Sequence, residues 1–129
     1  MTDQVQAAAS QSIAATISNG VVMMLHEHTG RGPTRARTTV TDDLVVVVLG
    51  ETMTKGEHRL RESGDGELVL SMRRRFQETM REELVALVEL HTGRTVSTFM
   101  SANNLDPDVA AEIFLLAPRH ADGTAARAA

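Results

Sequence analysis

The sequence predicts an α+β fold: two αββ units forming a four-stranded antiparallel sheet, with two long helices on one face and a short extra helix between the halves. Three observations lead to this prediction. Two long segments carry apolar residues at helical spacing, and two segments are rich in β-branched residues and contain turn residues. In addition, residues 28–31 (His-Thr-Gly-Arg) recur as residues 91–94, an offset of 63 (28 to 91).

Residues 6–28 are expected to form the first long helix. Their apolar residues recur at steps of three and four and therefore share one helical face. These residues are Ile13, Ile17, Val21, Met24 and Leu25. Gly20 either weakens this helix by about 1 kcal/mol relative to alanine or marks a close packing contact. The helix should stop at Gly30, which can adopt the left-handed conformation, and Pro33 cannot continue it.

A β-hairpin should follow, with strands at residues 35–41 and 44–49 and a turn at Asp42-Asp43. The second strand reads Leu-Val-Val-Val-Val-Leu, which is typical of a central strand covered on both faces. The two long helices can cover only one face of the sheet. The other face needs a partner, and the most economical one is a second copy of the chain, so we expect a homodimer.

The second half should begin with a short helix that ends near Glu62. Thr54 and Glu57 have the spacing of a capping box at its start. Asp65 can cap the next helix, over residues 67–92, whose apolar stripe is expected to face the core. This stripe contains Leu68, Met72, Phe76, Met80, Leu84, Leu87 and Val88.

Two further strands, at residues 95–101 and 110–116, should flank a turn-forming loop at residues 103–108. The offset of 63 also aligns the apolar stripes of the two long helices, which indicates an internal repeat of residues 6–50 and 67–117. We expect a single domain over residues 1–118. Residues 119–129 are polar and alanine-rich, so a disordered tail is expected there.

Several motifs in this order resemble the MpsC-type domain family over roughly residues 6–116. They are Gly30-Arg31-Gly32-Pro33, the run Asp42 to Leu49, Thr54-x-x-Glu57 with Leu60, Gly64-x-Gly66 before Leu68-Val69, and the final strand with Phe114. The resemblance implies an accessory component of a bacterial sodium-translocating, membrane-potential-generating system that is related to inorganic-carbon uptake machinery. It implies no catalytic residues.

The composition and the segment pattern of the sequence indicate in which cellular compartment the protein is located. The sequence has no cysteine, so disulfides and thiolate sites are impossible, and we expect a cytoplasmic protein. The N-terminus lacks the basic start and apolar run of a signal peptide. No stretch approaches the roughly 20 apolar residues of a membrane span. Any membrane role should therefore pass through a transport protein partner and not through direct insertion.

One loop is the candidate binding site. Gly30 and Gly32 let the backbone approach a ligand, while Arg31, Arg35 and Arg37 can grip an anion such as carboxylate, phosphate or bicarbonate. Arg35 and Arg37 fall on the same face of a strand. In the alternative interpretation the glycines only stop the helix and the arginines pair with carboxylates of the protein.

Other site chemistries are not expected. His26, His28 and His91 lie near helix C-termini, where the helix dipole favours histidine, so we predict no metal and no cofactor. The carboxylates have ordinary surface spacing and no serine sits in a nucleophile elbow, so we predict that the protein is not an enzyme. The run Arg73-Arg74-Arg75 fans around its helix, the net charge is -4 and aromatics are 2%, which disfavours nucleic acid.

Together these features predict a non-enzymatic accessory or regulatory protein that acts through homodimerisation and protein partners. The alternative is a sensor of bicarbonate or a phosphorylated metabolite that uses the loop at residues 30–37.

Overall fold

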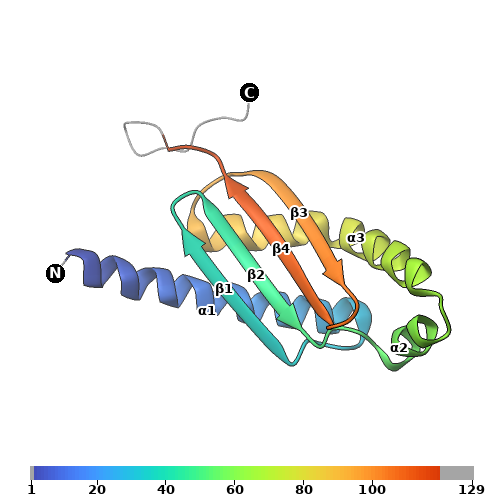
Figure 1. Ribbon diagram of the computed structural model, residues 1–129. Helices are drawn as coiled ribbons and strands as arrows, with labels where there is room; N and C mark the ends of the chain where they lie inside the picture. Colours follow the sequence, from blue (N-terminus) through green and yellow to red (C-terminus); the bar gives the residue numbers. More distant parts are fainter. Residues whose placement is uncertain (1, 120–129) are drawn as a thin grey trace.

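The computed structural model describes residues 2–119, which form three helices and one four-stranded sheet; two long helices pack against the sheet, and the short helix packs against the second of them (Figure 1). In chain order the elements are α1 (Thr2–Thr29), β1 (Arg35–Thr41), β2 (Leu44–Gly50), α2 (Lys55–Glu62), α3 (Gly66–Thr92), β3 (Val96–Asn104) and β4 (Val109–Leu116). The predicted α+β class is confirmed. The predicted tail lies outside the described residues, apart from Arg119.

The strand order in the sheet is β1-β2-β4-β3, and every neighbouring pair is antiparallel. The two hairpins therefore join through their second strands, where Val45 lies opposite Phe114. This arrangement places β2 in the interior of the sheet, as its apolar sequence predicts. The outer strands are the more polar β1 and β3.

The helices α1 and α3 lie on the same face of the sheet (Figure 1). The first contacts β1, the second contacts β3, and the two helices contact each other. Between helices and sheet lies one apolar core, formed by Ile17, Val21, Val45, Val47, Leu49, Met80, Leu84, Val88, Phe99, Ala110, Phe114 and Leu116. Burial of these side chains is the main favourable term in folding.

The two long helices end in the same way. Gly30 and Gly93 follow them with positive φ angles of 75° and 68°. The amide nitrogen of each glycine donates to the carbonyl oxygen four residues earlier at 2.9 Å. The hydroxyls of Thr29 and Thr92 likewise donate to the carbonyl four residues earlier, at 2.7 Å. Because alanine or any larger residue is disfavoured at such φ angles, both stops depend on glycine.

Gly20 marks the close contact between α1 and α3. A Cβ atom at this position would lie 2.8 Å from Cδ1 of Leu87, which is too close for carbon atoms. Of the two interpretations that the sequence left open for this glycine, the structure therefore supports the packing contact. The lower helix propensity of glycine is tolerated because it lets the two helices approach.

The first turns of α3 differ from the expected pattern. Leu68 and Phe76 are exposed, whereas Val69 and Gln77 are buried in their place. The N-terminal part of α3 packs against α2 (Figure 1), whereas Gln77 is directed to Asn103 and Glu112 of the sheet and Phe76 lines a cavity. Asp65 occupies the N-cap position, but its side chain makes no capping hydrogen bond, contrary to expectation.

The last hairpin is longer than the sequence indicates. Residues 103 and 104, which were expected in the loop, belong to β3, and Asn104 pairs with Val109 of β4. Asparagine is a common turn residue, but here the ladder of backbone hydrogen bonds from β4 continues through both positions. The turn itself is thereby shortened to residues 105–108.

The face of the sheet opposite the helices is open in the part of the chain that the structure describes. Four large apolar side chains on this face are 36 to 46% exposed, and they are Leu44, Val48, Met100 and Leu115. Val46 and Ile113 lie between them and are half-buried. The charged side chains among the residues of the four strands on this face are Arg35 and Arg37, both on the outer strand β1. We call these eight residues together the open sheet face, which thus consists of Arg35, Arg37, Leu44, Val46, Val48, Met100, Ile113 and Leu115.

Candidate functional site

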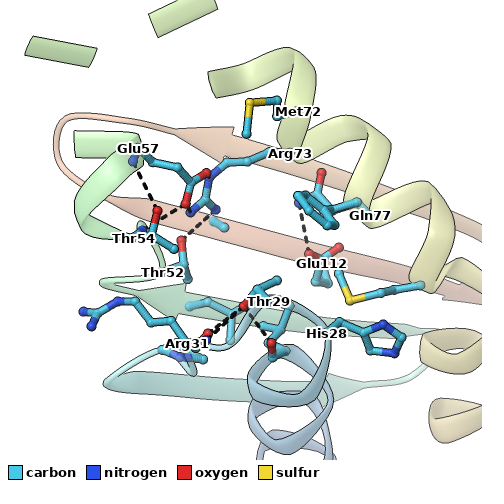
Figure 2. A pocket seen from close by; sticks show the side chains of 16 residues that line it. His28, Thr29, Arg31, Thr52, Thr54, Glu57, Met72, Arg73, Gln77 and Glu112 are labelled. Atoms are coloured by element: carbon cyan, nitrogen blue, oxygen red, sulfur yellow. Dashed lines mark hydrogen bonds and ion pairs between the residues drawn. The ribbon is translucent and has the colours of Figure 1, made fainter. Parts of the chain in front are cut away.

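A cavity of about 240 Å³ lies between α1, α3 and the sheet, where β2 ends and β4 begins (Figure 2). Its wall is largely apolar and is formed by Leu25, Leu49, Met72, Phe76, Met80 and Ala110. Two polar clusters interrupt this wall, one around Arg73 and one around Glu112. A concave apolar space with a few convergent polar groups is the usual form of a small-molecule site.

The first cluster is centred on Arg73, which enters the cavity from α3. Its Nε donates to Oε2 of Glu57 at 3.0 Å, its Nη2 to Oε1 of the same carboxylate at 3.3 Å, and its Nη1 to the hydroxyl of Thr52 at 2.8 Å (Figure 2). Both charged side chains are less than 15% exposed. Every nitrogen of the guanidinium group therefore has an acceptor within the protein.

The position of Glu57 is fixed by the start of α2. The Glu57 amide donates to the Thr54 hydroxyl at 3.1 Å, and the Thr54 amide donates to Oε1 of Glu57 at 2.9 Å. This reciprocal pair is the predicted capping box. One carboxylate thus caps a helix and binds Arg73, so the orientation of the arginine is tied to the beginning of α2.

The second cluster is centred on Glu112, a carboxyl group in the middle of β4 that is only 1% exposed. The hydroxyl of Ser101 on β3 donates to its Oε2, and Nε2 of Gln77 on α3 donates to its Oε1 at 3.3 Å. Burial raises the pKa of Glu112 to about 7, although both hydrogen bonds and the charge of Arg73 act to lower it. Near neutral pH this carboxyl group exists in both protonation states.

Gln77 is itself held by the sheet. Its Nε2 donates to Oδ1 of Asn103 at 3.1 Å, and Nδ2 of Asn103 donates back to its Oε1 at 3.0 Å. This reciprocal amide pair connects α3 to β3 next to Glu112. The donor that faces the carboxyl group is therefore fixed in place and does not need to rotate toward it.

The predicted loop arginines are placed apart from these clusters. Arg31 lies at the rim of the cavity, where its side chain points away from Glu112 and its Nη2 donates to the carbonyl oxygen of Glu51 at 3.3 Å (Figure 2). Nη2 of Arg35 lies 3.7 Å from Oε1 of Glu51. Arg37 lies on the open sheet face. The structure therefore brings Arg31 and Arg35 to one glutamate and does not bring Arg37 to it.

The two glycines of the loop have different surroundings. Gly30 provides the left-handed stop of α1, and a Cβ atom there would meet open space. Gly32 lies against α1, where a Cβ atom would be 3.5 Å from Cγ1 of Val22, an ordinary contact distance. Glycine is thus favoured at position 30 by the left-handed backbone conformation, whereas at position 32 there is enough space for a Cβ atom.

The candidate histidines at the helix ends form no metal site in the part of the chain that the structure describes. Nε2 of His28 lies 2.9 Å from Oε2 of Glu83 on α3, which ties the end of α1 to the neighbouring helix. Within residues 2–119, no three histidine or acidic side chains are placed together as metal ligands would be.

Sequence reasoning missed both residues that dominate the cavity. Glu112 is the one charged residue in β4, where Ala110, Phe114 and Leu116 alternate with it toward the core, and this interruption of an apolar face was a usable signal. In the sequence, Arg73 stands out only as part of the run Arg73-Arg74-Arg75. Its spacing of four residues from Gln77 indicated a shared inward face.

These features define a small α+β protein with an open apolar sheet face and, under its helices, a largely apolar cavity that contains two polar clusters. Residues 9–118 match the family described as Na+-translocating membrane potential-generating system (MpsC), so the chain belongs to the MpsC family. This confirms the resemblance that the sequence motifs indicate. No curated protein and no solved structure shows significant similarity to the chain. None of the helices within residues 2–119 has the length and apolarity needed to cross a membrane.

Proposed function

We propose that this protein is a non-enzymatic accessory component of a Na+-translocating membrane system and that it acts through protein contacts made by the open sheet face. Family membership supports the accessory role. The open sheet face is the single observation that supports contact-based action. A monomeric soluble protein seldom exposes a contiguous apolar patch of this kind unless the patch binds something.

A second copy of the chain is the occupant that fits this face best. The apolar side chains come from β2, β3 and β4, and both arginines lie on β1 at one edge. A two-fold axis parallel to the strands would place β1 of one copy over β3 of the other. The arginines of the two copies would then not face each other, and apolar surface would meet apolar surface.

The size of the face predicts a dimer of moderate affinity. Four strands about 4.8 Å apart, each with about seven residues at about 3.4 Å per residue, cover roughly 450 Å². Two copies would therefore bury on the order of 900 Å², which is close to the lower limit for a specific interface. We expect the chain to dimerise at micromolar concentrations in the cytoplasm. A membrane-protein partner could replace the second copy and bind the same surface.

Introducing a charge into the open sheet face should abolish the dimer. In Leu115→Glu, whose cross-strand neighbours Leu44 and Thr98 are uncharged, an unpaired carboxylate would be buried in the interface, and we expect the variant to be monomeric at concentrations where the wild-type chain is dimeric. Light scattering coupled to gel filtration measures this directly. Leu90→Glu is the matched control, because Leu90 is 75% exposed on α3 and lies outside the open sheet face. A wild-type monomer at micromolar concentration would refute the dimer.

A second candidate function is anion sensing by the loop at residues 30–37. It is favoured by the approach of both arginines to Glu51, of Arg31 to its backbone carbonyl and of Arg35 to its carboxylate, since an anion could replace the carboxylate beside Arg35. Bicarbonate or phosphate should then raise Tm by about 2 to 4 °C, and Arg35→Ala should lose this shift. Arg59→Ala, at an exposed position on α2, is the control. Equal stabilisation of Arg35→Ala would exclude this site.

A further inference from the structure

Glu112 is a buried carboxyl group at the cavity that lacks a cationic partner of its own. The charged or titratable groups that line the cavity with it are Arg73 from α3, Glu57 from α2, His28 from α1 and Arg31 just after α1, while the inward side chains of β2 and β3 carry no charge. Arg73 directs its nitrogens to Glu57 and Thr52. Arg73 and Glu57 balance each other, and Arg31 at the rim points away from Glu112 and donates to the carbonyl oxygen of Glu51 (Figure 2), so ionised Glu112 has no cation paired with it inside the cavity.

We propose that the cavity binds a small organic cation, a primary amine with a short apolar chain, whose ammonium group pairs with Glu112. An uncompensated charge is costly in a desolvated site, and a cationic ligand would supply the missing partner. The apolar wall formed by Leu25, Leu49, Met80 and the other apolar lining residues would receive the chain. The cavity of about 240 Å³ holds about eight heavy atoms at roughly 30 Å³ each.

The hydrogen bonds around Glu112 are compatible with a site that is empty or occupied. The Ser101 hydroxyl can donate to the ionised carboxylate, or rotate and accept from the protonated acid. The fixed amide of Gln77 donates to the other carboxyl oxygen in either state. The unliganded protein can therefore keep Glu112 protonated, and an ammonium ion would bind the ionised form and release a proton.

The affinity for an amine should consequently rise with pH. With a pKa of about 7, Glu112 is about 10% ionised at about pH 6 and almost fully ionised at about pH 8.5. A simple alkylamine stays protonated over this range. The expected gain in affinity between these two pH values is therefore about tenfold.

The test uses three probes of similar size and different charge, namely hexylamine, hexanoate and 1-hexanol, added to the full-length protein. Isothermal titration calorimetry at about pH 6 and about pH 8.5 should show hexylamine as the tightest binder, with the tenfold gain at the higher pH. Glu112→Gln should lose the preference for hexylamine over 1-hexanol. Glu82→Gln, which removes an exposed carboxylate of α3, should behave as wild type.

Several results would overturn the proposal. Hexanoate binding best, and more weakly as pH rises, would show that the protonated acid and Arg73 form an anion site. Equal binding of all three probes, or binding of none, would show that Glu112 recognises no cation. The pH dependence is measured on the wild-type protein, so the conclusion does not depend on the folding of a variant. The cavity lies on the helix side of the sheet, so this result is separate from that of the dimer experiment.

Discussion

Glu112→Gln is expected to raise the free energy of unfolding by about 3 kcal/mol at about pH 8. At this pH the wild-type protein must keep an ionised carboxylate buried, without a cation of its own to pair with it. Glutamine has nearly the same shape and no charge, and its amide can still meet Ser101 and Gln77. Removal of a native polar group from a core usually destabilises a protein. A gain in stability of this size would therefore show that the buried, ionised carboxylate of Glu112 destabilises the wild-type protein.

The sign and the pH range of this effect follow from the pKa of Glu112, which is raised from 4.5 to about 7. Between these values the folded state holds a proton that the unfolded state has released. The contribution of Glu112 to the free energy of unfolding is fully present below pH 4.5 and is lost as pH rises through about 7. The difference between wild type and Glu112→Gln should therefore grow over this range and level off above it.

Urea denaturation at a series of pH values, followed by circular dichroism, measures the difference between the two proteins. Glu82→Gln serves as the control and should follow the wild-type curve, because Glu82 is exposed. If Glu112→Gln is less stable than wild type at about pH 8, the carboxylate is instead stabilised by its surroundings. The proposed cation site would then lose its electrostatic basis.

The elements of this fold could be predicted because their signals are local. The stops at Gly30 and Gly93, the capping box at Thr54 and the β-branched run of β2 each depend on residues within a few positions. The exposed position of Phe76 could not be predicted in this way. Phe76 lines the cavity instead of the core, and the position of this cavity is a property of tertiary packing.

The cavity was harder to predict for the same reason. Glu112 meets Ser101 only because β3 and β4 pair in one register, and it meets Gln77 only because α3 crosses these strands. The sequence spacing between these residues contains no sign of the contact. By contrast, the glycine-arginine loop was conspicuous in the sequence, yet only Arg31 and Arg35 approach Glu51, and Arg37 lies further along β1 on the open sheet face.

The repeated motif places an arginine directly after each of the two helix stops, at Gly30 and Gly93. Arg31 and Arg94 occupy equivalent positions, but only Arg94 is buried, at 8% exposure. Its Nη1 donates to the carbonyl of Asp42 at 2.8 Å, and its Nη2 donates to Oδ1 of Asp43 at 2.6 Å and to the carbonyl of Ala117 at 2.7 Å. One side chain thus joins the end of α3, the β1-β2 turn and the end of β4.

Arg94→Met should therefore lower the free energy of unfolding by about 3 kcal/mol or more, since charge-assisted hydrogen bonds contribute about 1.5 to 3 kcal/mol each and are not fully additive. Arg31→Met should change it by less than about 0.5 kcal/mol, because its single hydrogen bond is exposed. Urea denaturation of the two variants gives both values. Equal effects would mean that the motif has one structural role in both halves. Unequal effects would show that the second half uses its arginine to hold the fold together, while the first half leaves its arginine at the rim of the cavity.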